Sequence, residues 1–148
     1  MKKHAPRALL VTVSMMMLIV SQTMGKPNQE DEAGMHLHYL EIVCHDVAAQ
    51  CAILERLHGV TFGPAVAEFG QARVARRPDG SMIGVRAPLA EHEQPIVRAY
   101  LEVADIEAAV KEAKAAGAVI AYGPVEQGDT GTWAIYILGD LQIGLWQR

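Results

Sequence analysis

The residues whose types could do chemistry are concentrated in one short stretch. Positions 35–46, MHLHYLEIVCHD, contain three histidines, one cysteine and two carboxylates. Imidazole, thiolate and carboxylate groups are the usual protein ligands of zinc and related divalent metals. His36 and His38 are two residues apart, a spacing that suits two ligands of one metal. Because two ligands do not complete a site, metal binding by this pair is an alternative hypothesis and not the main one.

The stretch leads into the first of two helices that the sequence predicts. Apolar residues spaced three or four apart predict helices over 47–58 and 106–116. Asp46 and Asp105 precede these helices, where a side-chain oxygen can accept hydrogen bonds from the free N–H groups of the first turn. The expected buried stripes are Val47, Cys51, Leu54 and Leu57 in the first helix and Ile106, Ala109, Val110 and Ala113 in the second.

Strand-like runs precede and follow each helix. The leading runs begin at Tyr39 and Tyr100. The later runs are VTFGPAVAEF, QARVARR and SMIGVRA after the first helix, and AVIAYGPVE, GTWAIYIL and LQIGLWQ after the second. Each half is therefore β-α-β-β-β, and the halves form an internal repeat of roughly 60 residues. Neither half can bury a core alone, so we expect an α+β fold in which the two halves pair.

This pattern resembles the vicinal oxygen chelate superfamily, which includes glyoxalase, extradiol dioxygenase and bleomycin-resistance proteins. The resemblance covers residues 37–147, and it is carried by HYLEIVCHDVAAQCAILERLHGV, VADIEAAVKEAKAAGA and GTWAIYILGDLQIGLWQ. It implies a glyoxalase-like domain over 35–148, in which two βαβββ modules, 36–87 and 96–148, pair to form a cupped mixed sheet. The superfamily hosts many unrelated functions, so the resemblance says more about the fold than about the activity.

The resemblance also implies where a metal would bind. In metal-dependent members, each module supplies two ligands to one divalent ion. The corresponding positions in this chain are Tyr39, Gly84, Arg98 and Gly144. Arginine has no lone pair to donate and glycine has no side chain. We therefore expect no metal and no other cofactor at these positions, with a non-standard divalent-metal site as the alternative.

Strand alternation predicts which side chains line the cup. Tyr39 and Glu41 share one face of their strand, whereas His36 and His38 belong to the opposite face. Glu41 and Glu102 are the candidate catalytic residues, because a desolvated carboxylate can act as a general base. The candidate ligand-binding residues are Tyr39, Met82, Arg86, Arg98, Tyr100, Gln142 and Trp146.

These lining residues support two interpretations. In the functional one, Arg98 and Arg86 hold an anionic or carbonyl group, while aromatic rings stack on a flat ligand. In the structural one, Arg98 pairs with Glu41 and Arg86 pairs with Glu102, which keeps the cavity electrically neutral.

Strand alternation alone does not determine how several other residues contribute to the cup. Gly84 and Gly144 leave space that a ligand could fill. Trp133 and Tyr136 lie on opposite faces of their strand, so only one of them can face the cup. The Gly-rich segment GPVEQGDTGTW joins two strands, and we expect it to form a loop at the rim of the cup.

The beginning of the chain has a different composition. A basic start, an apolar run too short to span a bilayer comfortably, and small polar residues predict a secretory signal peptide over 1–25. A polar linker over 26–34 follows. We expect export to the periplasm. The alternatives are a protein anchored in the membrane by this segment, or a cytoplasmic protein that starts at Met35.

Charge limits the partners of the folded part. Removal of 1–25 would leave 10 basic against 17 acidic groups, a net charge near −7, which argues against nucleic acid as a partner. Three functions remain. The first is a protein that binds a small organic molecule, and the second is a lyase, isomerase or dioxygenase-type enzyme. The third is an interaction module whose sheets pair in a homodimer.

Overall fold

The fold is built on a single curved sheet of eight strands in the order β2-β3-β4-β1-β5-β8-β7-β6. The structure is a computed structural model that describes residues 35–148, so the predicted signal peptide or anchor over 1–25 and the predicted linker over 26–34 lie outside the described residues. The elements are β1 (Leu37–Val43), α1 (Val47–His58), β2 (Ala65–Val66), β3 (Ala72–Arg76), β4 (Met82–Arg86), β5 (Ile96–Glu102), α2 (Ile106–Ala115), β6 (Val119–Glu126), β7 (Thr132–Leu138) and β8 (Leu141–Gln147).

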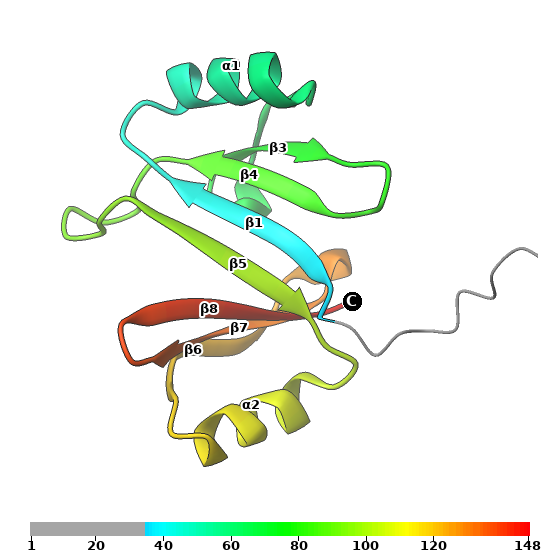
Figure 1. Ribbon diagram of the computed structural model, residues 1–148, viewed down its shortest axis with the longest axis vertical. Coiled ribbons are helices and arrows are strands. Elements are labelled where there is room, and N and C mark those ends of the chain that lie inside the picture. Colours follow the sequence, from blue (N-terminus) through cyan, green and yellow to red (C-terminus); the bar gives the residue numbers. More distant parts are fainter. Residues whose placement is uncertain (1–34) are drawn as a thin grey trace, which may run out of the picture. The chain divides into compact units, whose positions relative to one another are not determined.

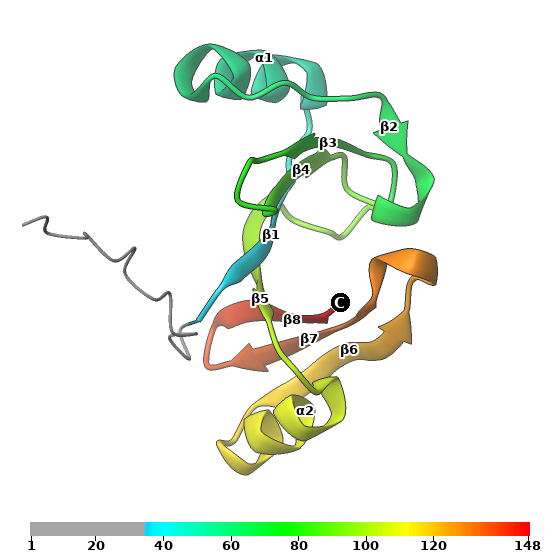
Figure 2. The same ribbon diagram turned by 90° about the vertical axis from the view of Figure 1, so that its right-hand side faces the viewer.

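Two βαβββ modules form this sheet, the first from β1 to β4 and the second from β5 to β8. Their leading strands, β1 and β5, run antiparallel at the centre, and each pairs in parallel with the last strand of its own module. Figure 1 shows α1 beside the first module and α2 beside the second. Figure 2 shows the curl of the sheet, with the short 3-10 helices Ala67–Phe69 and Gly128–Thr130 on its concave side. The predicted α+β fold with a cupped mixed sheet is confirmed.

Local capping determines where both helices begin. Asp46 Oδ1 accepts a hydrogen bond from Ala49 N at 2.9 Å, and Asp105 Oδ1 accepts one from Ala108 N at 3.0 Å. Helix α1 has the predicted bounds, and α2 ends one residue before the prediction. Leu57, predicted on the buried stripe of α1, is 64% exposed. The reason is that it lies about 90° around the helix from the centre of that stripe.

One predicted strand of the first module is largely irregular. The run VTFGPAVAEF contains only the two-residue strand β2, followed by the 3-10 helix Ala67–Phe69. Side chains satisfy the backbone groups that a longer strand would have paired. Phe62 N donates to Glu55 Oε1, while Arg73 donates to the carbonyl oxygens of Phe62 and Gly63. Because these groups are already bonded, the ladder does not extend toward the start of the run.

The core is divided among three clusters. One, around Cys51, Phe62 and Val85, lies between α1 and the sheet. A second, around Ile106, Val110 and Leu145, lies under α2. The third is an aromatic cluster on the concave face, and it forms the wall of the site described below. Within residues 35–148, neither helix is long and apolar enough to cross a membrane.

Candidate functional site

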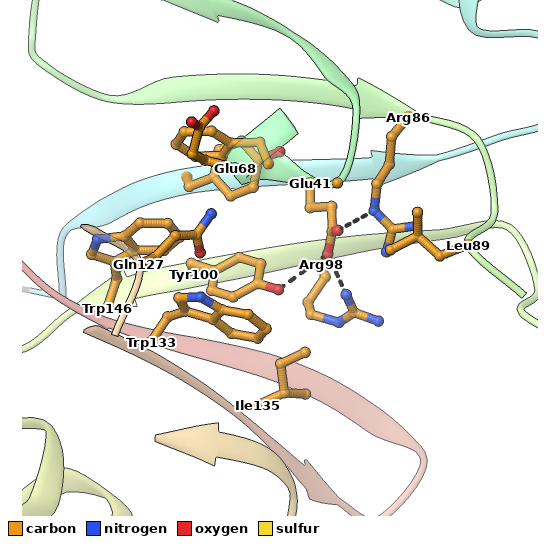
Figure 3. Close-up of a pocket in the computed structure, with 13 residues that line it drawn as sticks. Glu41, Glu68, Arg86, Leu89, Arg98, Tyr100, Gln127, Trp133, Ile135 and Trp146 are labelled. Carbon is orange, nitrogen blue, oxygen red and sulfur yellow. Dashed lines mark hydrogen bonds and ion pairs between the residues drawn. The ribbon is translucent and has the colours of Figure 1, made fainter. Parts of the chain in front are cut away.

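The concave face of the sheet contains a cavity of about 120 Å³. Five of its thirteen lining residues are aromatic, and they include both tryptophans of the sequence. Figure 3 shows the indole rings and Tyr100 toward one side and a charged group, Glu41 with Arg86 and Arg98, toward the other. The aromatic lining residues are Tyr39, Phe69, Tyr100, Trp133 and Trp146. Sequence-predicted residues from both modules are therefore brought together around one cavity.

Glu41 is the centre of the charged group. Arg86 Nε donates to Glu41 Oε1 at 2.6 Å, and Arg98 Nη1 donates to Oε2. Tyr100 Oη donates to the same Oε2 at 3.2 Å. Glu41, Arg86 and Arg98 are only 6%, 5% and 6% exposed, respectively. A buried carboxylate of this kind is tolerated because two guanidinium groups compensate its charge.

A second carboxylate binds Arg86 from outside the cavity. Glu93, on the connector between the modules, accepts from Arg86 Nη1 at 2.9 Å and from Nη2 at 2.6 Å. It also accepts from Leu89 N at 2.7 Å. The hydrogen bonds from Arg86 lower the pKa of the Glu93 carboxyl to about 2, so it is ionised at neutral pH. Two arginines and two glutamates thus form one network, which we call the Glu41–Glu93 network: Glu41, Arg86, Glu93 and Arg98.

Fewer of the guanidinium nitrogens of Arg98 than of Arg86 donate hydrogen bonds. Its Nη2 donates to Gln142 Oε1 at 2.7 Å, but its Nε is buried without a hydrogen-bond partner in the described part of the chain. The same holds for Tyr39 Oη and Trp133 Nε1. All three residues line the cavity. Burial raises the pKa of Tyr39, so its hydroxyl keeps its proton and remains a donor at neutral pH.

Each module packs a tyrosine ring on a strand glycine. An added Cβ at Gly84 would lie 1.9 Å from Tyr39 Oη, and one at Gly144 would lie 2.1 Å from Tyr100 Cδ1. The sequence predicted that the two glycines leave room for a ligand, and this prediction is wrong. The rings of Tyr39 and Tyr100 fill that room because both are folded over the neighbouring strand.

The same packing bears on the metal site that the resemblance implies. Tyrosine rings occupy the space beside Gly84 and Gly144, and Arg98 directs a positive group at Glu41. Residues 35–148 contain no group of three or more His, Cys, Asp or Glu side chains placed to hold a metal ion. The residues at these positions do not fit a divalent cation, because they offer it positive charge and ring carbon in place of ligands.

His38 lies on the cup side of β1, which corrects the alternation-based prediction. The register of β1 against β5 shifts between Leu37 and Tyr39, and this irregularity brings His38 to the same side as Tyr39. The His38 ring lies 5.1 Å from the Trp146 ring, and its Nδ1 lies 4.0 Å from Glu102 Oε2. Burial lowers the pKa of His38. His36, by contrast, is exposed.

Three other predicted residues lie away from the cavity. Glu102 accepts two hydrogen bonds from Arg148, so the predicted Arg86–Glu102 pair is wrong. Glu102 is at the far end of β5, about 13 Å along the strand from Arg98. Met82 is buried in the aromatic cluster, and Gln142 contacts the outer side of Arg98. None of the three lines the 120 Å³ cavity.

The sequence prediction missed several lining residues. Strand alternation predicted that only one of Trp133 and Tyr136 faces the cup. In the structure Trp133 lines the cavity, and Tyr136 packs near α2. Once Trp133 is assigned, Ile135 follows two residues later on the same face. The other missed residues come from irregular segments, which have no periodicity to read: Glu68, Phe69, Gly70, Leu89 and Gln127.

No family model matches the chain, and no curated protein does. Several solved structures share its fold. A methylmalonyl-CoA epimerase from Mycobacterium tuberculosis aligns at 16% identity with a TM-score of 0.58, covering 76% of this chain and 87% of that one. A hypothetical protein from Bacillus halodurans aligns at 14% identity with a TM-score of 0.61, covering 78% and 95%.

A third similar structure is a Streptomyces coelicolor methylmalonyl-CoA epimerase in complex with 2-nitronate-propionyl-CoA. It aligns at 17% identity with a TM-score of 0.53, covering 76% of this chain and 96% of that one. At such identities the likeness establishes the fold alone. The mixed eight-stranded sheet with two helices is the fold that this chain shares with these neighbours.

Proposed function

We propose that this protein is a metal-independent member of the vicinal oxygen chelate superfamily that binds a small organic molecule in the cup. The observation that carries the proposal is the cavity itself, where five aromatic side chains face a buried charged group. Small-molecule sites are typically concave and mostly apolar, with a few convergent polar groups that orient the ligand. Export and pairing into a homodimer remain predictions from the sequence.

The volume of the cavity limits the size of the ligand. It measures about 120 Å³. An engineered protein cavity of about 150 Å³ holds one benzene molecule, whereas sites for drug-sized ligands measure about 300–1,000 Å³. The ligand, or the part of it that enters the cup, is therefore about the size of one six-membered ring.

Tryptophan fluorescence should report this binding directly, because both tryptophans line the cavity. Titration with a panel of single-ring compounds is expected to give a saturable change for at least one of them, and fused two-ring analogues, which cannot enter the cavity whole, should bind more weakly. Ile135→Phe fills the cavity with an apolar side chain and should weaken that binding about ten-fold or more. Circular dichroism of the variant checks the fold. Equal binding by Ile135→Phe and the parent protein would place the ligand elsewhere.

Metal independence is tested by elemental analysis. After loading with zinc, nickel, iron or manganese and then desalting, we expect far less than one metal ion per chain. The reason is that Tyr39, Gly84, Arg98 and Gly144 offer no suitable ligand. Near-stoichiometric metal that disappears in His36→Ala or His38→Ala would instead support the non-standard site predicted as an alternative.

The second candidate is a lyase or isomerase with Glu41 as the base. It is favoured by one observation, that this buried carboxylate lines the cavity. The methylmalonyl-CoA epimerases with the same fold make it the enzyme class to test. Against it, donors from Arg86, Arg98 and Tyr100 already occupy both oxygens of Glu41. An isomerase would exchange the α-hydrogen of a bound carbonyl compound with D₂O, and NMR would detect loss of that exchange in Glu41→Gln.

A further inference from the structure

We propose that the ligand of the cup is an uncharged hydrogen-bond acceptor, such as an amide, ketone or ester, and not a carboxylate. The proposal rests on the proposed function above and adds the chemical class of the ligand. Two arginines beside a cavity would ordinarily indicate an anionic ligand. Three features of the site argue for a neutral one: the balance of its charges, the occupancy of Arg86, and the kind of polar atoms left without partners.

The charges of the site are already balanced. In the Glu41–Glu93 network, two guanidinium groups face two carboxylates, joined by ion pairs of 2.6 Å from Arg86 to each glutamate and by the pair between Arg98 and Glu41. The one further charged group in the cavity lining, Glu68 at its rim, is negative and exposed. A bound carboxylate would therefore bring uncompensated negative charge into a largely desolvated site, which is strongly unfavourable.

Arg86 has no free fork to offer an anion. Its Nε donates to Glu41, its Nη2 donates to Glu93, and its Nη1 donates to both Glu93 and the carbonyl oxygen of Ala87. A ligand carboxylate would have to displace the Glu93 carboxylate from Arg86. Glu93 belongs to the same chain, and its carboxylate also accepts a hydrogen bond from Leu89 N. Arg86 is thus a structural residue that joins the connector to the sheet.

The polar atoms left without partners can all donate a hydrogen bond, although the hydroxyl Tyr39 Oη can also accept one. Within residues 35–148, Arg98 Nε, Tyr39 Oη and Trp133 Nε1 are buried and unbonded, and all three residues line the cavity. These atoms are covered by neighbouring atoms, so a ligand oxygen pairs with one of them only after a small shift of the cavity wall. The unmade hydrogen bond of a buried donor favours such a shift, because a ligand acceptor then satisfies it. A carbonyl oxygen supplies that acceptor without adding charge.

The test compares isosteric pairs that differ in charge. Benzamide with benzoate, and isobutyramide with isobutyrate, are matched in size and fit the volume limit. Dissociation constants are measured by tryptophan fluorescence and confirmed by NMR shifts of the two indole N–H groups. We expect each amide to bind at least ten-fold more tightly than its carboxylate. Equal or tighter binding of the carboxylates would overturn the inference while leaving the proposed function intact. Failure of every single-ring compound, charged or neutral, would overturn both.

A pair of variants tests the electrostatic reason. Glu93→Gln removes one negative charge from the network, so the affinity for benzoate should rise about ten-fold. The affinity for benzamide should change less than two-fold. Glu91→Gln is the matched control, because Glu91 is an exposed carboxylate on the same connector. An equal rise in both variants, or no rise in Glu93→Gln, would show that the Glu41–Glu93 network does not set the charge preference.

Discussion

Replacement of Glu41 by glutamine should lower the free energy of unfolding by about 3–5 kcal/mol. The variant keeps the shape of the side chain but leaves Arg86 and Arg98 as two buried positive groups that face a neutral amide. Removing one partner of a buried ion pair is far more destabilising than removing a pair at the surface. Urea unfolding followed by tryptophan fluorescence measures the change, because both tryptophans lie in the same cavity wall.

Two further variants separate the charge effect from a general loss of structure. Glu102→Gln breaks the ion pair with Arg148, whose side chain is 61% exposed, and should cost less than about 1 kcal/mol. Arg98→Met added to Glu41→Gln removes the excess positive charge and should recover part of the lost stability. If the double variant is less stable than Glu41→Gln alone, the destabilisation does not come from uncompensated charge.

Gly84→Ala should destabilise the protein by about 3 kcal/mol or more, although it adds a single methyl group. The new Cβ would lie 1.9 Å from Tyr39 Oη and 2.6 Å from two of its ring carbons. Tyr39 is only 3% exposed and is packed against Phe69, Tyr100 and Trp146, so its ring cannot move aside. The thermal midpoint and urea unfolding curves of the variant measure the effect.

A second-site change checks the cause of this effect. Tyr39→Leu removes the clashing ring atoms without breaking a hydrogen bond to the described residues, because Tyr39 Oη has none there. We expect Gly84→Ala to cost less in the Tyr39→Leu background than in the parent protein. Gly63→Ala is the control, since its Cβ would meet Val74 O at an ordinary 3.6 Å. Equal effects at Gly63 and Gly84 would contradict the packing explanation.

The parts of the fold that depend on local sequence could be predicted from it. Asp46 and Asp105 cap their helices because the interaction joins residues three apart. The segment around Phe62 could not be predicted in the same way. Its backbone is bonded by Glu55 and Arg73, which are distant enough in sequence that no periodic pattern links them to it. The interruption of the predicted strand is thus a tertiary effect on a sequence that favours extended structure.

The site divides in a similar way. Glu41 and Arg98 could be placed on the cup from strand alternation combined with the pairing of the modules, and the structure puts them in contact. The face of the sheet on which His38 lies could not be predicted, because the register shift in β1 breaks the alternation on which the prediction depended. The contact of Glu93 with Arg86 could not be predicted either. Glu93 lies in an irregular connector, so no strand or helix periodicity indicates which way its side chain points.

The central position of β1 has a consequence for the order in which the molecule can assemble. Its neighbours β4 and β5 are made much later, and the contacts of Glu41 with Arg86 and Arg98 span 45 and 57 residues. During synthesis, one edge of β1 therefore stays unpaired until β4 has left the ribosome, and the other edge stays unpaired until β5 has. Pairings of such long range delay folding, because chain entropy must be lost before any contact forms. The strand that holds Glu41 is the first strand of the described residues to be made, and its two edges are covered only after the whole first module and then β5 have been made.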